Sequence, residues 1–403
     1  MKYIIVLGDG MADEPIASLG NKTLLQAVDT PYMDMLAQKG RNGLLETVPS
    51  GYHPGSEIAN LSVLGYDLDE VFEGRGSLEA ASMGIDIEEN EIAMRCNLVC
   101  IENNLLKNHS AGHISNEESW ELIRYLQKNL GGDDVNFFPG VSYRHLLKMK
   151  EGSKFIKCIP PHDVPGTPFR DILIKAEKPE GLRTADRLNN LIFKSQEILQ
   201  NHPVNQKRIA EGKDPANSIW PWSPGNKPRM KSLSELYGIK NGVVISAVDL
   251  IRGIGIYAGL KPINVEGATG LYTTNYEGKA DTALEALKTN DFVFLHVEAS
   301  DEAGHEGDIE LKMKTIEYLD RRLLKRIIEG APSLGEPLTI GLLPDHPTPC
   351  RLRTHTAMPV PFVIYKPGTT GDEVKNFDEI SANKGIYGTL SKDMFIKEFF
   401  KQL

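Results

Sequence analysis

The sequence predicts a two-domain α/β protein, in which a mostly parallel sheet flanked by helices is interrupted by a smaller inserted α+β domain. Three observations support this prediction. At 403 residues the chain exceeds the size at which a single core usually divides. Its apolar runs are continuous and rich in Val, Ile and Phe, as in strands buried on both faces of a parallel sheet. Helix-like segments separate several of these runs, as in a layered α/β structure.

The strands and helices of the sheet domain follow in chain order. We expect strands at 2–8, 242–248, 291–297, 338–344 and 360–365, which read KYIIVLG, GVVISAV, DFVFLHV, LTIGLLP and VPFVIY. We expect helices at 77–85, 281–290 and 310–330, the last with apolar residues spaced by three and four. GIGIYA at 253–258 matches a dinucleotide-binding pattern, but it lies inside an expected helix and not at a strand-to-helix turn, so we assign it to packing.

The middle of the chain differs in composition. Between Ala93 and Trp222 it holds the strand-like MRCNLVCI, a helix near EESWELIRYLQKNL, the Pro-rich CIPPHDVPGTP and a long polar helix around ADRLNNLIFKSQEILQN. Residues of the types that bind metals lie mainly on both sides of this stretch. We therefore predict a discontinuous core formed by 1–92 and 223–403, with an inserted domain at 93–222.

Composition and charge exclude several classes of protein. With 40% hydrophobic and 25% charged residues, the chain is typical of a folded globular protein. Its net charge of −10 disfavours a nucleic-acid partner, because affinity for phosphate backbones needs a basic surface. The four cysteines show no C-x-x-C spacing, which argues against a zinc ribbon and a disulfide framework. The first apolar run is too short for a signal peptide or a membrane span, so we expect a cytoplasmic protein with no membrane partner.

Acidic residues follow three of the expected strands. Asp9, Asp301 and Asp345 each come after one of these runs, and His346 is next to Asp345. Open parallel sheets bind ligands beyond the carboxyl ends of their strands, so we expect these side chains to share one site.

One segment concentrates possible ligands. Residues 296–307 read HVEASDEAGHEG and hold four carboxylates and two histidines: Glu298, Asp301, Glu302, Glu306, His296 and His305. Its two glycines and many like charges give it little helix propensity. A solvated acidic loop tolerates such a run, because salt screens its charges. Asp301 and His305 are four residues apart, however, and this spacing lets both side chains face one cation.

Ser56 lies in PGSEIANLSVLGYD, at the expected start of a helix. A serine there is commonly a structural N-cap. It can also be a nucleophile, because helix N-terminal amides stabilise a phosphate placed on its oxygen. The segment alone leaves both roles open.

Taken together, Asp9, PGSEIANLSVLGYD, GRGSLEAASMGI, ASDEAGHEGD, PDH and RTHTAMPVPFVIY resemble the cofactor-independent phosphoglycerate mutases of the archaeal type, within the alkaline phosphatase superfamily. The resemblance covers nearly the whole chain and implies an alkaline-phosphatase-like core. It implies two divalent ions, Mn, Zn or Mg, and no organic cofactor. One ion would be held by Asp9, Ser56, Asp345 and His346, and the other by Asp301, His305 and His355. His296, Glu298, Glu302 and Glu306 would surround these ligands or face solvent.

The resemblance also implies a reaction. Ser56 would be the nucleophile that takes the phosphoryl group from a small phosphorylated metabolite and returns it to a different oxygen. The substrate and the product would be 3-phosphoglycerate and 2-phosphoglycerate, which are interconverted in glycolysis. The inserted domain would act as a substrate-binding lid that keeps water from the phosphoserine. A simple phosphomonoesterase would fit the metals equally well, but it needs no such lid.

One departure from the family pattern keeps a second function open. NHSAGHIS at 108–115 stands where these mutases carry an arginine-rich D-R-R-A-G-R stretch, so guanidinium groups that bind phosphate and carboxylate are missing. A stretch without arginine at this place is typical of a branch of the family that is proposed to consist of homoserine kinases. These enzymes use a nucleotide as phosphoryl donor in threonine biosynthesis. We expect substrate contacts from His113, Arg144 and Lys279. An ordinary loop histidine is the alternative for the first, and a surface ion pair for the other two.

Overall fold

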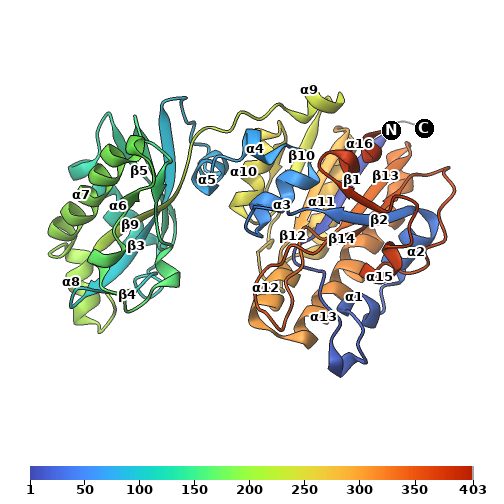
Figure 1. Cartoon of the computed structure of the whole chain (residues 1–403), viewed down its shortest axis with the longest axis horizontal. Helices are drawn as coiled ribbons and strands as arrows, with labels where there is room; N and C mark the ends of the chain where they lie inside the picture. Colours follow the sequence, from blue (N-terminus) through green and yellow to red (C-terminus); the bar gives the residue numbers. More distant parts are fainter. Residues whose placement is uncertain (402–403) are drawn as a thin grey trace. The chain divides into compact units, whose positions relative to one another are not determined.

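The structure, a computed structural model, describes residues 1–401 and divides the chain into two compact units (Figure 1). The first unit comprises Met1–Phe72 and the segment from Arg229 onward, and the second comprises Glu73–Pro228. The second unit thus begins before the expected boundary at residue 93 and ends after residue 222. The reason is that α5 (Arg75–Ser82) packs on β3 (Glu91–Glu102). A Cβ added at Gly76 would lie 2.3 Å from the carbonyl oxygen of Ala93, so this contact requires glycine.

The first unit is built on an eight-stranded sheet in the order β11-β10-β12-β1-β13-β14-β2-β15. The strands are β1 (Lys2–Gly8), β2 (Arg41–Glu46), β10 (Gly242–Ile245), β11 (Lys261–Ile263), β12 (Phe292–Val297), β13 (Leu338–Leu343), β14 (Val360–Tyr365) and β15 (Thr389–Ser391). All pairs are parallel except those that β14 makes with β13 and β2. The five expected strands all belong to this sheet, and the prediction of a mixed α/β fold with a mostly parallel sheet is confirmed.

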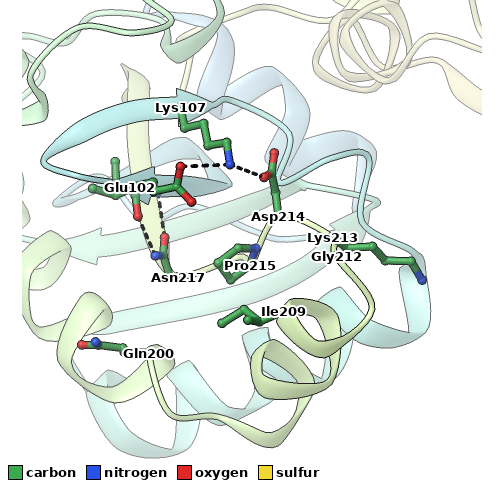
Figure 2. Close-up of a pocket in the computed structure, with 10 residues that line it drawn as sticks. Glu102, Lys107, Gln200, Ile209, Gly212, Lys213, Asp214, Pro215 and Asn217 are labelled. Atoms are coloured by element: carbon green, nitrogen blue, oxygen red, sulfur yellow. Dashed lines mark hydrogen bonds and ion pairs between the residues drawn. The ribbon is translucent and has the colours of Figure 1, made fainter.

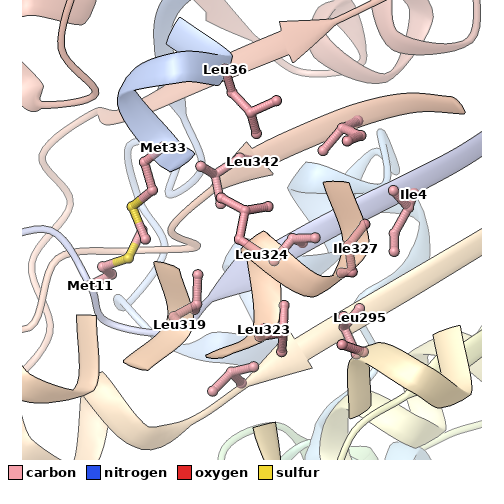
Figure 3. Close-up of a cluster of buried hydrophobic side chains, with 14 of the residues drawn as sticks. Ile4, Met11, Met33, Leu36, Leu295, Leu319, Leu323, Leu324, Ile327 and Leu342 are labelled. Atoms are coloured by element: carbon pink, nitrogen blue, oxygen red, sulfur yellow. The ribbon is translucent and has the colours of Figure 1, made fainter. Parts of the chain in front are cut away.

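Helices cover both faces of this sheet. They are α1 (Leu24–Ala27), α2 (Pro31–Lys39), α3 (Ser56–Val63), α4 (Leu68–Val71), α9 (Leu233–Tyr237), α10 (Asp249–Tyr257), α11 (Tyr276–Leu287), α12 (Ala299–Glu306), α13 (Ile309–Tyr318), α14 (Lys325–Gly330), α15 (Glu379–Ala382) and α16 (Met394–Phe400). On one face Ile4, Leu295 and Leu342 of the strands pack against leucines of the helical region 319–327 (Figure 3). On the other face the ring of Tyr3 meets the ring of Phe399 of α16, with centroids 5.8 Å apart. The alternation of strand residues between two apolar layers explains why the runs are continuous.

The helix expected at 310–330 is interrupted by a π-helical turn, η5 (Leu319–Leu324), between α13 and α14. The turn places the buried carboxylate of Asp320 against the start of α2. Its Oδ1 accepts hydrogen bonds from the backbone amides of Tyr32 at 3.0 Å and Met33 at 2.7 Å. Asp320 therefore caps a helix whose own N-cap residue, Thr30, makes no side-chain cap.

The second unit has an antiparallel sheet of its own, in which β4-β3-β6-β5 are neighbours and β9 also pairs with β3. Its larger elements are β3, β4 (Leu105–Asn108), α6 (Asn116–Leu130), β5 (Val135–Val141), β6 (Arg144–Lys150), α7 (Leu182–Leu199), α8 (Pro203–Ala210) and β9 (Ser218–Gly225). A short pair, β7 (Ile156–Lys157) with β8 (Lys175–Ala176), lies between them in the chain. Because the entering strand β3 pairs with the leaving strand β9, the unit forms a core of its own.

Among residues 1–401, no helix has the length and apolar character needed to cross a membrane.

Candidate functional site

The carboxyl ends of β1, β12 and β13 bring the candidate ligands to one edge of the sheet. β1 pairs in parallel with β12 on one side and with β13 on the other, and the pairing extends to the last residues of the strands. Asp9, Glu298 and Asp345 follow these strands and so start from neighbouring positions. The loop after Asp9 needs glycine, because Gly10 has φ +60 and an added Cβ would lie 2.6 Å from the Cα of Asp301.

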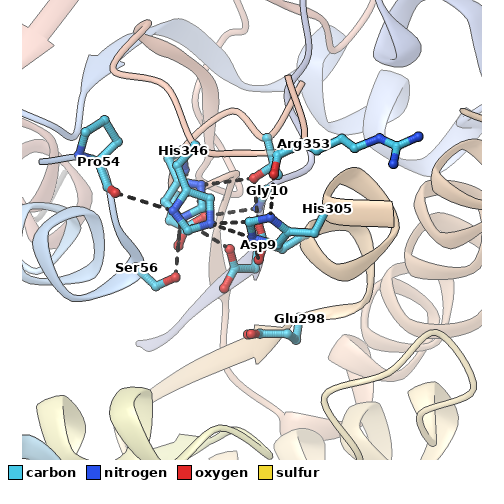
Figure 4. Close-up of polar contacts among 12 residues, drawn as sticks. Asp9, Gly10, Pro54, Ser56, Glu298, His305, His346 and Arg353 are labelled. Carbon is cyan, nitrogen blue, oxygen red and sulfur yellow. Dashed lines mark hydrogen bonds and ion pairs between the residues drawn. The ribbon is translucent and has the colours of Figure 1, made fainter. Parts of the chain in front are cut away.

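The first group of candidate ligands includes the hydroxyl of Ser56, which lies at the edge of the group and faces His346 (Figure 4). Oγ of Ser56 lies 3.3 Å from Nε2 of His346. The same nitrogen is 3.6 Å from Oδ1 of Asp9 and 3.6 Å from Oδ2 of Asp345. Asn60, one turn after Ser56 on α3, donates a hydrogen bond of 2.9 Å to Oδ2 of Asp345. This bond ties the start of α3 to the carboxylate, so the structure brings these predicted residues together.

The second group consists of Asp301, His305 and His355. The two oxygens of Asp301 lie 3.1 Å from Nε2 of His305 and 3.3 Å from Nε2 of His355. The two Nε2 atoms are 2.9 Å apart. Asp301 and His305 meet because 299–306 forms α12, despite its low helix propensity, and residues four apart share a helix face. His355 reaches them from the loop that follows β13.

The imidazoles of this second group turn Nδ1 away from the other ligands. Nδ1 of His305 is 3.0 Å from the carbonyl oxygen of Arg353, and Nδ1 of His355 is 3.4 Å from that of Pro54. A carbonyl oxygen only accepts hydrogen bonds, so these contacts favour a proton on Nδ1, and each Nε2 offers a lone pair once it gives up the proton that it donates to Asp301. A neutral Nε2 of this kind is a metal donor.

Buried carboxylates dominate the electrostatics of the site. Asp9 and Asp345 are 0% exposed and Asp301 is 4% exposed. Burial, and then the charge of Asp345, raises the pKa of Asp9 well above its usual range. Burial opposes ionisation of Asp301 as well, but hydrogen bonds with His305 and His355 hold its pKa well below its usual range. Oδ1 of Asp9 has no hydrogen-bond partner. The site thus contains several buried carboxylate oxygens, one of which has no partner, and imidazole nitrogens beside them. This set of donor atoms fits divalent cations.

Ser56 is the first residue of α3, and the N-cap position belongs to Gly55, which has no side chain to cap with. The structural N-cap role that the sequence left open therefore does not apply. Ser56 is half-buried, and its hydroxyl faces the first ligand group. The N-terminal amides of α3 favour a phosphate at this oxygen, because the helix dipole is positive there.

His296 and Glu298 belong to the site, although the sequence placed them outside the ligand sets. His296 is 0% exposed, with Nε2 2.9 Å from Oδ2 of Asp9 and Nδ1 3.1 Å from Oγ of Ser246. Oε2 of Glu298 lies 3.7 Å from Nε2 of His296 and has no hydrogen-bond partner. The run DFVFLHV already indicates that His296 has a polar partner, because a histidine inside a strand buried on both faces must be paired.

Lys279 lies beneath the site and not where a substrate could reach it. It is 0% exposed on α11, and its Nζ donates a hydrogen bond of 3.1 Å to the carbonyl oxygen of His296. Burial lowers the pKa of Lys279 to about 8. The predicted contact with substrate does not fit this position, because α11 packs on β12 and directs the ammonium group under the strand.

A second buried lysine joins two of the ligand-bearing loops. Nζ of Lys312 donates to Oδ2 of Asp13 at 2.9 Å, to the carbonyl oxygen of Ala12 at 3.1 Å and to that of Thr348 at 2.8 Å. Ala12 and Asp13 lie in the loop after β1, and Thr348 lies in the loop after β13. Because Lys312 and Asp13 are both buried, this ion pair holds the two loops together inside the unit.

The predicted residues His113 and Arg144 lie in the second unit, in a set that we name the histidine–arginine face: Arg95, His109, His113, Tyr143, Arg144, His162 and Trp222. The ring of Tyr143 lies 6.2 Å from that of His113 and 5.7 Å from Cζ of Arg144. Arg144 is exposed, and no carboxylate of residues 1–401 forms an ion pair with it. An exposed guanidinium on an aromatic ring is able to bind an anion.

Strand pairing completes this face in a way that the sequence did not reveal. Arg95 pairs with Trp222 across β3 and β9, and its Cζ lies 4.5 Å from the indole ring centre. His162 contacts the same indole at 5.3 Å and lies 6.2 Å from His109. Burial lowers the pKa of both histidines. The register of β3, β6 and β9, which short-range patterns do not determine, assembles the set.

A cavity of about 410 Å³ elsewhere in the second unit lacks such convergent groups (Figure 2). Its lysine, Lys107, is already paired with Glu102 and Asp214, both at 3.0 Å. Its amide, Asn217, exchanges two hydrogen bonds of 2.8 Å with the backbone of Ile101. Because the polar groups in the wall satisfy one another, we do not assign this cavity a catalytic role.

Comparison with known proteins gives consistent matches. A sequence model of the family described as 2,3-bisphosphoglycerate-independent phosphoglycerate mutase matches residues 37–205. A protein of Methanosarcina barkeri with that name is 50% identical over 390 residues, which cover 96% of each chain. Two solved structures are also similar. A Pyrococcus horikoshii protein has a TM-score of 0.83 and 30% identity, covering 100% of this chain and 98% of that one. A cofactor-independent phosphoglycerate mutase of Thermoplasma acidophilum has a TM-score of 0.70 and 27% identity, covering 99% of both.

Proposed function

The chain belongs to the 2,3-bisphosphoglycerate-independent phosphoglycerate mutase family, and from this membership we propose that it interconverts 3-phosphoglycerate and 2-phosphoglycerate. One structural observation carries the proposal. Oγ of Ser56 lies at the N-terminus of a helix and 3.3 Å from Nε2 of His346, a nitrogen that is 3.6 Å from both Asp9 and Asp345. Such a hydroxyl is suited to accept and return a phosphoryl group.

We assign two divalent ions, Mn, Zn or Mg, to the two ligand groups. Asp9, Ser56, Asp345 and His346 would hold one ion, and Asp301, His305 and His355 would hold the other. Bound there, the ions would neutralise phosphoryl oxygens and favour the ionised serine hydroxyl. Oxygen ligands dominate the first group and imidazole nitrogens the second, a mixture compatible with all three metals.

Ser56 then exchanges one phosphoester for another. Its Oγ attacks phosphorus, an Oγ–P bond forms, and the bond from phosphorus to the substrate oxygen breaks. The proton of the serine hydroxyl ends on the released glycerate hydroxyl. In the second half the other hydroxyl of glycerate attacks the phosphoserine, and Ser56 regains its proton. No water is consumed, so the glycerate must be held near Ser56 while the phosphoserine exists.

Substrate binding is assigned to the second unit. His113 and Arg144 carry donors suited to a carboxylate or a phosphate, and Arg144 has no competing carboxylate among residues 1–401. Arg95 lies in the same face, but it is largely buried and forms an ion pair of 3.1 Å with Glu79, so we assign the anion contact to Arg144. We propose that this unit acts as a lid during transfer, and that the enzyme works in the cytoplasm on a small phosphorylated metabolite.

The test combines an assay with a mass measurement. Metal-loaded protein is incubated with 3-phosphoglycerate alone, and 2-phosphoglycerate is quantified. Intact-mass spectrometry of the quenched reaction should show one added phosphate on the wild type and none on Ser56→Ala, whose turnover should be undetectable. Ser62→Ala, a buried serine on the same helix, serves as the control and should keep the adduct.

A parallel reaction with ATP and homoserine tests the alternative that the sequence left open. The mutase proposal expects no phosphohomoserine there. ATP-dependent phosphorylation of homoserine, with no 2-phosphoglycerate formed from 3-phosphoglycerate, would overturn the proposed substrate while retaining Ser56 as nucleophile.

A further inference from the structure

The loop between β4 and α6 contains three consecutive residues with a left-handed backbone. Their φ angles are +46 at Ala111, +65 at Gly112 and +53 at His113. Glycine adopts this conformation readily, but for the other two residues it is uncommon, because the Cβ atom crowds the backbone. Such a backbone persists only where the surrounding structure holds it. Contacts from other parts of the second unit must therefore fix this segment.

Arg208 of α8 provides one of these contacts. Its Nη2 donates a hydrogen bond of 2.6 Å to the carbonyl oxygen of Ala111, and its Nε donates one of 2.9 Å to that of Asp214. Its Nη1 forms an ion pair with Glu118 of α6. Arg208 is 2% exposed, and its planar guanidinium group gives the three bonds fixed directions. The loop is thus tied both to α6 and to the chain that follows α8.

Asn97 of β3 provides a second contact, two residues earlier in the loop. Its Nδ2 donates a hydrogen bond of 3.3 Å to the carbonyl oxygen of His109. Its Oδ1 accepts one of 3.0 Å from the indole nitrogen of Trp222. Asn97 is also buried, so side chains of the interior hold the loop at His109 and at Ala111.

The two contacts fix where the loop places its histidines. The rings of His109 and His113 lie 5.7 Å and 6.2 Å from the ring of Tyr143, and Cζ of Arg144 lies 5.7 Å from the same ring. His113 and Arg144 are exposed, so a dissolved anion can reach both. A change of φ at His113 from +53 to the usual negative values would redirect its side chain. The position of His113 on this face therefore depends on the left-handed backbone.

We propose that Arg208 is a positioning residue for substrate binding, which holds Ala111, Gly112 and His113 in the left-handed conformation and so keeps His113 beside Arg144. This inference rests on the proposed function, because it takes the histidine–arginine face as the place where the carboxylate or phosphate of the substrate binds. Arg208 itself is buried and acts through the loop. Because the loop is ordered before the substrate arrives, binding does not have to supply the free energy of ordering it.

The first test separates substrate binding from chemistry. In metal-loaded Arg208→Gln, KM for 3-phosphoglycerate should rise about tenfold or more, as expected when a charge-assisted hydrogen bond to the substrate is lost. The value of kcat, the number of bound ions and the phosphate adduct on Ser56 at saturating substrate should not change. Arg208→Lys should lie between the wild type and Arg208→Gln, because lysine keeps the charge beside Glu118 but lacks the planar fork.

Arg187→Gln is the matched control. Arg187 belongs to the same unit and also donates a hydrogen bond to a backbone carbonyl, that of Lys150 at 2.9 Å, but it makes no printed contact with the loop. Its substitution should leave KM unchanged.

The second test needs no substrate. Hydrogen exchange followed by mass spectrometry should show faster exchange in peptides covering 108–114 of Arg208→Gln, where the amide of His113 donates to Oγ of Ser110 at 3.2 Å. Peptides of α7 should keep the rate of the wild type. Glu118→Gln preserves the shape of the side chain and removes its charge, so it should give a smaller increase in the same peptides. Circular dichroism establishes that each variant is folded, and Arg208→Lys and Glu118→Gln carry both tests if Arg208→Gln does not fold.

Two results would overturn the role of Arg208. One is unchanged exchange of 108–114 in a folded variant, since Arg208 would then not hold the loop. The other is faster exchange with an unchanged KM, since the conformation of the loop would then not matter for the substrate. A wild type that forms no 2-phosphoglycerate would instead overturn the proposed function, and the exchange measurement would still decide whether Arg208 holds the loop.

Discussion

Two parts of the molecule are built in opposite ways. One is the ligand end of the first unit, by which we mean the candidate metal ligands at the carboxyl ends of β1, β12 and β13. The other is the histidine–arginine face of the second unit. Asp9, Asp345 and His346 are 0% exposed and follow central strands of a parallel sheet. On the face, Arg144 and His113 are exposed, and they come from a strand and a loop of an antiparallel sheet. Buried ligands are held by the core, whereas exposed groups are free to adapt to a substrate. The difference fits the proposal that the first unit carries out the reaction and the second unit recognises the substrate.

Removing a buried ligand tests the first half of this comparison and should give the largest effect. Asp301→Ala should lose one bound ion and about 10³-fold in kcat, since the loss of metal stabilisation amounts to several kcal/mol. Elemental analysis and the phosphoglycerate assay measure both quantities. Glu306→Gln, on the same helix but exposed, should change neither. Full activity of a folded Asp301→Ala variant would show that the ligands are misassigned.

Part of the ligand end was accessible to sequence reasoning, because Asp9, Asp345 and His346 follow strands directly. Continuous apolar runs located β1, β12 and β13, and polar residues directly after such runs had to meet at one sheet edge. The sequence failed for His296, because the strand period does not show which buried polar residue touches which ligand. The antiparallel direction of β14 was likewise not predicted, since its run VPFVIY looks like that of a parallel strand.

The second unit shows why long-range contacts and the boundary between the units could not be predicted from the sequence. Arg95 and Trp222 are far apart in the sequence and meet only through the pairing of β3 with β9. Register is set by packing across the whole sheet, and a one-residue shift would move Arg95 to the other face. The boundary at Glu73 depends on α5, whose composition fits either unit. It joins the second because Gly76 permits close contact with β3.

The buried ion pair of Lys312 and Asp13 tests whether the core holds the ligand loops. Lys312→Met should lower the free energy of unfolding by about 3–5 kcal/mol, because it leaves Asp13 buried without its partner. Urea unfolding of the metal-free protein measures this change. Arg326→Met is the matched control, since its exposed pair with Asp281 should contribute at most about 1 kcal/mol. Equal effects of the two substitutions would contradict the assignment.

An exposed residue of the histidine–arginine face tests the second half of the comparison. Arg144→Ala should raise KM for 3-phosphoglycerate about 10- to 100-fold, corresponding to roughly 1.5–3 kcal/mol for a charge-assisted hydrogen bond. The number of bound ions and the phosphate adduct on Ser56 should persist at saturating substrate. Arg183→Ala, which alters an exposed arginine of the same unit that is paired with Glu151, should leave KM unchanged. A loss of metal in Arg144→Ala would contradict the proposal that metal binding and substrate binding belong to different units.

The smallest effect, taken per pH unit, concerns a buried carboxylate that is not among the proposed metal ligands. Burial raises the pKa of Asp320 to about 7, although the amides of Met33 and Tyr32 donate to it. Its pKa in the unfolded chain is about 3.9, so the folded state binds the additional proton between about pH 4 and pH 7. The free energy of unfolding should therefore fall as pH rises through this window, by at most about 1.4 kcal/mol per pH unit from this group.

Asp320→Asn separates this contribution from that of a second buried carboxyl, because burial also raises the pKa of Glu379 to about 7. Urea unfolding of metal-free protein at several pH values should show a shallower decline in the variant, with the part due to Glu379 retained. Asp281→Asn, at an exposed ion pair, should keep the slope of the wild type. An unchanged slope in Asp320→Asn would mean that Asp320 is ionised in the folded protein. Burial would then be insufficient to keep a carboxyl group protonated in this core, and the contrast between buried and exposed groups would need another cause.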